Sequence, residues 1–254
     1  MDEILITSQR DGAVKEIVLN RPEKRNALAP PMFDALIEAF ESGSGENERM
    51  VLIRGEGRAF CAGVDLSERI QNGWPQESPL VRLCEAIRTY PLPVVAAVQG
   101  DAIAGGAMLT MHCDLIIAAE GARLAMPLAQ LGIAPPWILT SRTIDRVGPA
   151  LGRDLVLLGN PISAERLYQH NAVNACVPRE AFRAEVDRVV DRLVANAPLS
   201  LRAVKAALAK IGDAGGEHGH PDEDRLVREA LDSTDAREGM RARLERREPV
   251  FQGR

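Results

Sequence analysis

Short apolar segments alternate with helical segments along the first two thirds of the chain, and this alternation restricts the fold more than any other feature. Apolar runs typical of strands cover residues 16–20, 50–54, 93–98 and 115–119. Prolines, small residues or apolar spacing indicate helices between them, over residues 30–40, 79–90 and 105–113. Strands that alternate with helices predict an α/β fold.

From about Pro149 onward the pattern is helical. Residues 180–197 carry valines and leucines at helical spacing, and residues 199–211 are predicted as a second helix. Asp235 and Glu238 have the spacing of a capping box that would open a last helix. We therefore predict an α/β core over residues 1–196 and a helical region over residues 197–254.

Composition excludes several classes of function. The 254-residue chain has a formal net charge of −5 and only 4% aromatic residues, which argues against nucleic acid as a partner. It has no apolar run of about 18 residues, so a membrane-spanning helix is not expected. No basic and apolar signal segment opens the chain, and its four cysteines lie far apart. These features favour a cytoplasmic protein with reduced cysteines and no metal site.

Two glycine-containing segments follow predicted strands, at residues 58–66 and 100–108. Glycines let the backbone approach a ligand closely, and N–H groups at a helix start favour negative charge. Two N–H groups directed at one oxygen would form an oxyanion hole. On spacing alone, tight connections between strands and helices are the favoured interpretation of both segments. Neither has the spacing of a nucleotide phosphate loop.

A resemblance that covers nearly the whole chain favours the first reading. Leu19–Leu28, Arg58–Leu66, Gly100–Gly132 and Glu238–Phe251 resemble, in this order, four blocks of the crotonase superfamily, the enoyl-CoA hydratase/isomerase family. The resemblance implies a spiral of ββα units and C-terminal helices that assemble trimers or hexamers. It also implies an acyl-CoA thioester as ligand, with coenzyme A as part of the substrate and no separate cofactor, and a role in fatty acid metabolism.

The resemblance also implies roles for individual residues. The backbone N–H groups of Val64 and Gly105 would polarise the thioester carbonyl. Residues expected to contact coenzyme A are Arg25, Ala27, Ala62, Asp65 and Leu66. Residues expected to line the acyl pocket are Met108, Leu128 and Trp137, with Met126 equally suited to core packing.

The acidic positions of the family are apolar in this chain. Hydratases of the family activate water with two glutamates, whose positions hold Met108 and Leu128 here, and a third acidic position holds Pro136. Neither Met nor Leu transfers protons. We therefore expect a crotonase-type lyase or isomerase that binds acyl-CoA and does not hydrate enoyl-CoA efficiently. Two alternatives stay open: glutamate-independent chemistry such as decarboxylation, and a non-catalytic acyl-CoA-binding protein.

Other polar residues could take part in chemistry, but each is better explained by a structural or surface role. The possible replacement acids are Glu68, Glu85, Asp101 and Asp145. The histidines and the cysteine considered are His112, His218, His220 and Cys61. His218 and His220 could bind zinc, and Cys61 could act as a nucleophile, but a surface loop and a buried thiol are the simpler interpretations.

Overall fold

The computed structural model describes residues 3–66, 78–131, 134–211, 233–235 and 249–254, together with 238, 242, 245 and 247. The strands are β1 (Ile4–Gln9), β2 (Val14–Leu19), β3 (Met50–Gly55), β4 (Val94–Val98), β5 (Ala102–Ile103), β6 (Leu115–Ala119), β7 (Arg123–Ala125), β8 (Ile162–Ser163) and β9 (Ala175–Val177). The helices are α1 (Pro30–Glu41), α3 (Pro79–Thr89), α4 (Gly105–His112), α5 (Trp137–Val147), α6 (Pro149–Arg153), α7 (Ala164–Gln169), α8 (Phe182–Val194) and α9 (Pro198–Ile211). Short 3₁₀ turns at Pro22–Lys24 and Ala129–Leu131 and a π-helical turn at Asp154–Leu158 complete the described elements.

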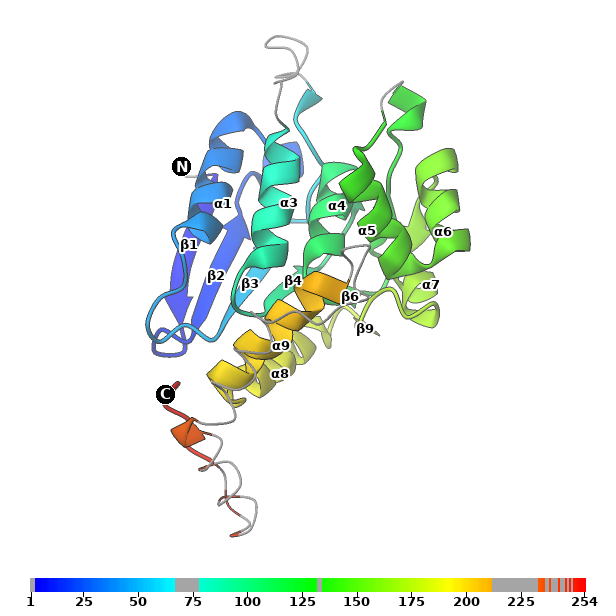
Figure 1. Ribbon diagram of the computed structural model, residues 1–254. Coiled ribbons are helices and arrows are strands. Elements are labelled where there is room, and N and C mark those ends of the chain that lie inside the picture. The colour runs from blue at the N-terminus through cyan, green and yellow to red at the C-terminus, as the bar shows by residue number, and fades with distance from the viewer. Residues whose placement is uncertain are drawn as a thin grey trace.

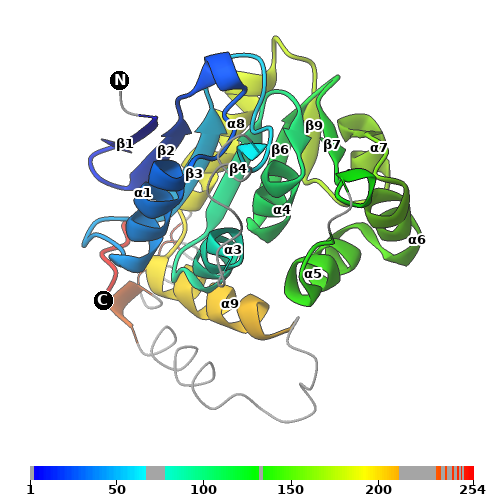
Figure 2. The same cartoon turned by 90° about the horizontal axis from the view of Figure 1, so that it is seen from above.

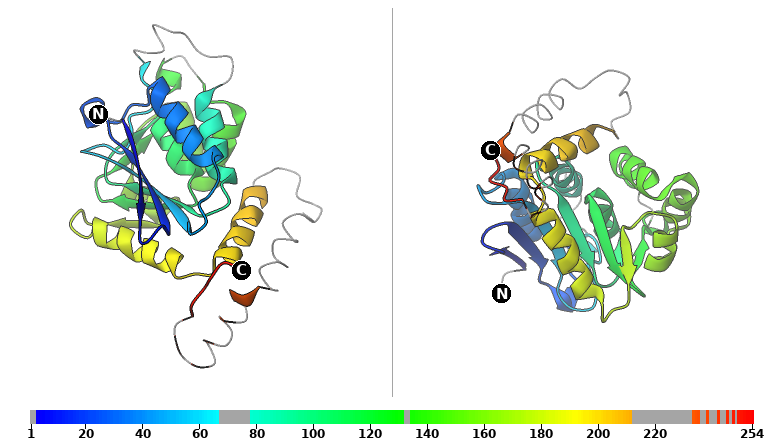
Figure 3. Two further views of the ribbon diagram at one scale, coloured as in Figure 1. Left: turned by 90° about the vertical axis from the view of Figure 1, so that its left-hand side faces the viewer. Right: turned by 90° about the horizontal axis from the view of Figure 1, so that it is seen from below.

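A six-stranded sheet in the order β1-β2-β3-β4-β6-β9 forms the centre of the molecule. β1 and β2 pair antiparallel, and the remaining neighbours pair parallel. Helices α1, α3 and α4 cover one face of the sheet, and α8 lies on the other (Figures 1 and 2). Seen from below, α8 runs across that second face (Figure 3). The α/β class predicted from the sequence is confirmed.

The buried strands place successive side chains on opposite faces of the sheet. On β3, Val51 and Ile53 pack with the helices α1, α3 and α4, whereas Met50 and Leu52 pack with α8. Both faces are covered, which explains why these strands read as continuous apolar runs rather than alternating ones.

A second, three-stranded sheet, β5-β7-β8, positions the start of α4. β5 pairs in parallel with β7, so that Ile103 lies opposite Ala125, directly before the helix begins. All eight residues of α4 are buried. A helix that is apolar on every side belongs inside a protein, and α4 accordingly lies between α3 and α5 (Figure 1).

The interpretation that the chain is purely helical from about Pro149 is wrong. β8 joins the small sheet there, and β9 extends the main sheet beside β6. Both strands have three residues or fewer, too few to show a period. The N-terminal strand β1 was also not predicted. The proposed division at residue 196 falls between α8 and α9 and stays a prediction.

The capping box predicted at Asp235 is replaced by a different contact. The Asp235 carboxylate accepts hydrogen bonds from the N–H groups of Gln252 and Gly253, both at 2.7 Å. This residue therefore anchors the C-terminal end of the chain. Within the described residues, no helix is long and apolar enough to cross a membrane.

Candidate functional site

The two glycine-containing segments lie against each other. Cys61 forms a parallel bridge with Ala102, and the Ile103 N–H donates to the Cys61 carbonyl oxygen at 2.8 Å. A Cβ atom on Gly106 would lie only 2.3 Å from that same oxygen. The close approach of the segments therefore requires glycine at position 106.

The N–H groups of Val64 and Gly105 lie side by side where these segments meet. Gly63 has a φ of +91°, and a Cβ on it would lie 3.0 Å from the Gly105 nitrogen. A Cβ on Gly105 would lie 3.4 Å from the Val64 nitrogen. Neither N–H group donates a hydrogen bond within the described part of the chain. Gly105 is the first residue of α4, where the helix itself leaves the N–H unpaired.

Val64 is held in place by pairing with the segment after β2. Leu28 and Val64 form a parallel bridge, in which the Leu28 N–H donates to the Gly63 carbonyl at 2.7 Å and the Asp65 N–H donates to the Leu28 carbonyl at 2.9 Å. These bonds use the groups on either side of the Val64 N–H and leave that N–H directed elsewhere. The opening block Leu19–Leu28 thus supports the first glycine segment.

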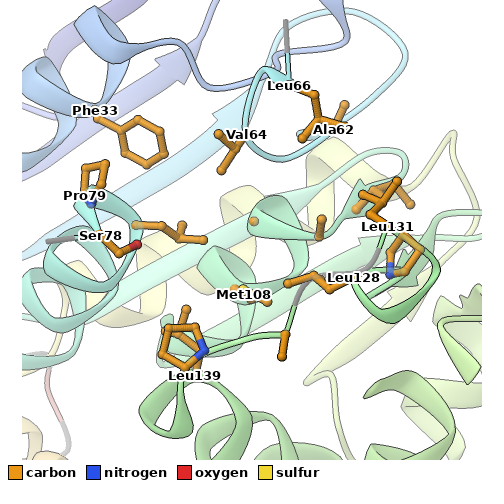
Figure 4. A pocket seen from close by; sticks show the side chains of 17 residues that line it. Phe33, Ala62, Val64, Leu66, Ser78, Pro79, Met108, Leu128, Leu131 and Leu139 are labelled. Carbon is orange, nitrogen blue, oxygen red and sulfur yellow. The ribbon is translucent and has the colours of Figure 1, made fainter. Parts of the chain in front are cut away.

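An apolar cavity of about 410 Å³ adjoins the two N–H groups (Figure 4). Val64 and Phe33 point into it from one side, and Met108 and Leu128 from the other. The described lining residues are Phe33, Ala62, Val64, Leu66, Ser78, Pro79, Leu80, Ile103, Ala104, Gly105, Met108, Pro127, Leu128, Leu131, Ala134, Pro136 and Leu139. Among them only Ser78 has a polar side chain, and its hydroxyl accepts the Val81 N–H as the N-cap of α3.

A second cavity of about 310 Å³ shares Ala62 and Ile103 with the first. The guanidinium groups of Arg25, Arg58 and Arg123 border it, together with the carboxylate of Asp101. Arg123 donates to Asp101 through two hydrogen bonds, of 3.0 and 2.5 Å. Two arginines therefore stay unneutralised at this cavity, because Arg25 and Arg58 form no ion pair within the described residues.

The structure brings most of the predicted residues to these two cavities. Ala62, Val64, Leu66, Gly105, Met108 and Leu128 line the apolar cavity, and Arg25 lines the arginine-bordered one. Sequence patterns did not indicate a site role for Arg58 and Arg123, or for the apolar residues Phe33, Leu80 and Leu139. Arg58 is the first residue of the first glycine segment, which was the available signal.

Three predicted residues have other surroundings. Trp137 does not line the apolar cavity, because its side chain is 69% exposed at the start of α5, while its neighbours Pro136 and Leu139 point inward. Asp65 is buried and forms an ion pair with Arg21 at 2.8 Å. The carbonyl of Ala27 accepts a hydrogen bond from the same arginine at 3.1 Å. Asp65 and Ala27 therefore stabilise the loop through their contacts with Arg21.

None of the described replacement acids reaches the apolar cavity. Hydrogen bonds from Arg88 lower the pKa of Glu85, so that this carboxylate stays ionised and paired. Asp101 is held by Arg123 in the second cavity, and Asp145 is exposed on α5. Glu68 lies outside the described residues, as do His218 and His220. The described chain contains no cluster of three or more potential metal ligands.

Cys61 and His112 are buried structural residues. Burial raises the pKa of the Cys61 thiol to about 12, and the thiol donates to the Asn26 carbonyl at 3.2 Å. A thiol with this pKa is not a nucleophile at neutral pH. Burial lowers the pKa of His112 to about 4, and its Nδ1 lies 2.7 Å from the Met108 carbonyl oxygen. The imidazole is therefore neutral and caps the helix on which it lies.

The parallel sheet, the helical C-terminal part and the two apposed glycine segments define a protein of the crotonase fold. A crystal structure described as an enoyl-CoA hydratase/carnithine racemase from Magnetospirillum magneticum superposes with a TM-score of 0.91 at 29% identity, covering 100% of this chain and 97% of that one. An enoyl-CoA hydratase structure from Bacillus anthracis gives 0.87 at 28% identity and covers both chains fully.

Sequence comparison identifies the family within this fold. The enoyl-CoA hydratase/isomerase family model matches residues 9–254. The 2,3-dehydroadipyl-CoA hydratase of Escherichia coli K12 is 31% identical over 257 aligned positions, which span both proteins completely. The chain belongs to the enoyl-CoA hydratase/isomerase family.

Proposed function

We propose that this protein binds an acyl-CoA thioester whose carbonyl oxygen accepts hydrogen bonds from Val64 and Gly105. The observation that carries the proposal is the pair of adjacent N–H groups without a partner at the edge of an apolar cavity. Two such donors withdraw electron density from the carbonyl and stabilise an enolate, and each is typically worth about 3 kcal/mol of barrier. The 410 Å³ cavity beyond them suits the hydrocarbon part of the acyl group.

The arginine-bordered cavity supports the placement of coenzyme A. The phosphates of coenzyme A carry several negative charges, and arginine pairs well with phosphate oxygens. Arg25 and Arg58 are available for them beside the apolar cavity, on the side opposite to the acyl group. Coenzyme A would enter as part of the substrate, and the proposal includes no separate cofactor. We expect Ala62, which borders both cavities, to contact the ligand between its two ends.

The apolar cavity wall argues against efficient hydration. Adding water to an enoyl thioester requires groups that deprotonate the water and protonate the carbon, and the described wall supplies neither. Met108 and Leu128, which stand where hydratases of the family have glutamates, both face the cavity. The proposed reaction class is therefore one that uses the N–H pair without a proton-transferring side chain.

Decarboxylation of a malonyl-type thioester is the candidate reaction that this wall favours. The bond to the carboxylate carbon breaks, carbon dioxide leaves, and the electron pair moves onto the thioester as an enolate held by the two N–H groups. The enolate carbon then takes a proton from water. An apolar environment destabilises the charged carboxylate and therefore favours its loss as carbon dioxide. The first step accordingly needs no general base.

Calorimetry with two ligands tests the binding mode. Butyryl-CoA carries the carbonyl, and the thioether S-butyl-CoA replaces it with a methylene group. Hydrogen bonds contribute about 0.5–1.5 kcal/mol each, so two of them predict roughly tenfold tighter binding of the thioester. Equal affinities would exclude the carbonyl contact, and absence of binding by either ligand would exclude the whole proposal.

Arginine variants and turnover assays complete the test. Arg25→Ala and Arg58→Ala should each weaken butyryl-CoA binding, whereas Arg153→Ala, an exposed change on α6, should leave it unaltered. Release of carbon dioxide from malonyl-CoA would establish the decarboxylase. Tight binding of acyl-CoA without turnover of any enoyl-, malonyl- or aryl-CoA thioester would identify a non-catalytic acyl-CoA-binding protein instead.

The assembly and location of the protein are part of the same proposal. The family resemblance predicts a trimer or hexamer, and the outward side chains of Val204, Leu208 and Ile211 on α9 give the helical region an apolar surface. Analytical ultracentrifugation measures the assembly directly. We expect a cytoplasmic protein, and cell fractionation tests this.

A further inference from the structure

Two side chains flank the pair of N–H groups, and both line the apolar cavity. One is Val64, which carries the first N–H group itself. The other is Ala104, which precedes Gly105 and shares a peptide group with the second. A Cβ on Gly105 would lie 3.4 Å from Val64 Cγ2 and 3.3 Å from Leu80 Cδ2, so the valine branch and Leu80 together cover the start of α4. Any group bound by both N–H donors therefore lies close to the side chains of Val64 and Ala104.

Neither side chain can easily move aside. Valine is branched at Cβ, which restricts its χ1 angle. Ala104 has φ +49° and ψ −115°, a conformation that residues other than glycine rarely adopt. Its N–H donates to the Ala125 carbonyl at 2.8 Å, and its carbonyl accepts the Met108 N–H at 3.0 Å. The peptide groups on both sides of Ala104 are thus fixed, and the methyl group with them.

The position of the carbonyl determines which part of an acyl group meets these side chains. An oxygen that accepts from both donors lies about 3 Å from each nitrogen. The sulfur leads toward the arginine-bordered cavity, so the carbon bonded to the carbonyl passes beside Val64 and Ala104. The next carbons reach a wider space walled by Met108, Leu128 and Leu139. Met and Leu adjust their rotamers more readily than Val or a fixed methyl group.

We propose that Val64 and Ala104 select acyl groups that are unbranched at the carbon next to the thioester carbonyl. This inference rests on the proposed binding of acyl-CoA and adds the substrate class to it. A methyl branch at that carbon meets the Val64 side chain or the Ala104 methyl group. A branch one carbon further enters the wide part of the cavity. The protein therefore distinguishes acyl groups by the position of the branch and not by their overall size.

Isomeric acyl-CoA ligands measure this selectivity, because the two ligands of a pair have the same atomic composition. Butyryl-CoA and isobutyryl-CoA contain the same atoms and differ only in a branch at the first carbon. Valeryl-CoA and isovaleryl-CoA form a second isomeric pair, branched further along. Calorimetry of the wild-type protein should give about tenfold tighter binding of butyryl-CoA over isobutyryl-CoA, the usual discrimination for one misplaced methyl group. The second pair should differ by about twofold or less.

Variants assign the selectivity to the two residues. Val64→Ala keeps the backbone N–H and should reduce the butyryl-to-isobutyryl ratio to about threefold or less. Ala104→Gly removes the other methyl group and should reduce the butyryl-to-isobutyryl ratio to the same extent. Glycine adopts the φ at this position without strain. Val81→Ala is the matched control, because Val81 packs against the core on α3 but does not line the cavity. It should keep the wild-type ratio.

The possible outcomes separate this inference from the proposed function. If no acyl-CoA binds, the proposed function itself fails. If butyryl-CoA and isobutyryl-CoA bind the wild-type protein equally, or if Val64→Ala and Ala104→Gly keep the wild-type ratio, the inference is overturned while acyl-CoA binding stands. Thermal unfolding of each variant checks that the fold is intact. The Ala104→Gly arm decides the question if Val64→Ala does not fold.

Discussion

At the scale of single residues, the proposed reaction class depends on Met108 and Leu128. Both face the apolar cavity, and Met108 lies on the helix whose first N–H group is half of the donor pair. If the remainder of the site is arranged for a thioester, the missing proton-transfer groups can be supplied by substitution. General acid–base groups typically contribute 10²–10⁴-fold to a rate, so the gain should be measurable.

The double variant Met108→Glu/Leu128→Glu should hydrate crotonyl-CoA at least about 100-fold faster than the wild-type protein. Each single variant should gain far less, because one glutamate positions the water while the other activates it. Loss of the enoyl absorbance during turnover measures the rate. The matched control is Met108→Gln/Leu128→Gln, which has the same shape but no titratable group. Equal rates for the two double variants would contradict the prediction.

Sequence alone identified the candidate residues that are proposed to act through their backbone or that occupy a motif position. Val64, Gly105, Met108 and Leu128 could be placed because each lies in or beside a recognisable segment. Phe33 and Leu139 reach the same cavity from α1 and α5. Helical spacing shows that such residues face inward but does not show which cavity they meet. Trp137 begins a helix at the cavity rim, and its direction depends on that helix start rather than on its apolar character.

At the scale of elements, long periodic helices and buried apolar strands were predictable, whereas the exposed strand β1 and the strands of two or three residues were not. Helix α3 was predicted at residues 79–90 and observed at Pro79–Thr89, and β6 was predicted at its observed bounds. β5 and β9 have two and three residues and form only through pairing with strands distant in sequence. Local sequence carries little information about such pairing. The short strand β5 nevertheless fixes where α4 begins, and thus where the Gly105 N–H points.

The burial of α4 makes the stability of the protein depend on pH through His112. Burial lowers the pKa of this imidazole to about 4 from an ordinary value of 6.5, with the Met108 carbonyl, Glu85, Arg142 and Arg146 as its polar surroundings. The unfolded chain therefore binds more protons than the folded one between these two values. Stability is unaffected by His112 above about pH 7 and decreases as the pH falls through 6.5 toward 4.

His112→Gln removes the titration and keeps a donor for the Met108 carbonyl. Between pH 7.5 and 5.0, His112 should cost the wild-type protein about 2 kcal/mol of unfolding free energy, a loss absent from the variant. Urea unfolding of both proteins at the two pH values gives the loss of unfolding free energy for each protein. The contributions of carboxylates that both proteins share cancel when the two losses are compared. A wild-type loss equal to that of His112→Gln would show that the imidazole titrates normally when folded.

At the scale of the whole molecule, the charge beside the candidate site has the opposite sign to the net charge of the chain. The chain carries −5 overall, yet the cavity beside the N–H pair has three arginines and one aspartate. The excess of acid predicted from composition therefore lies away from the candidate site. The apolar cavity, the N–H pair and the arginines follow one another in space, although their residues come from α1, α3, α4, α5, β7 and the loops that connect the elements of this part of the chain.

A buried ion pair connects the helical region to this core. Lys205 on α9 is 3% exposed, and its ammonium group donates to both carboxylate oxygens of Asp114 at 2.8 and 2.6 Å. It also donates to the Ile87 carbonyl at the end of α3, at 3.3 Å. Removing one partner of a buried pair leaves the other charge uncompensated, which costs about 3–5 kcal/mol.

Lys205→Ala should therefore lower the unfolding free energy by about 3 kcal/mol or more, and hydrogen exchange should become faster in α9 before it does so in the central sheet. Lys210→Ala, an exposed change on the same helix, should alter stability by less than about 1 kcal/mol. In the double variant Lys205→Met/Asp114→Asn the loss should be smaller than the sum of the losses measured for Lys205→Met and Asp114→Asn singly, because neither charge is left unpaired. Additive losses would show that α9 is held to the core by apolar packing and not by this pair.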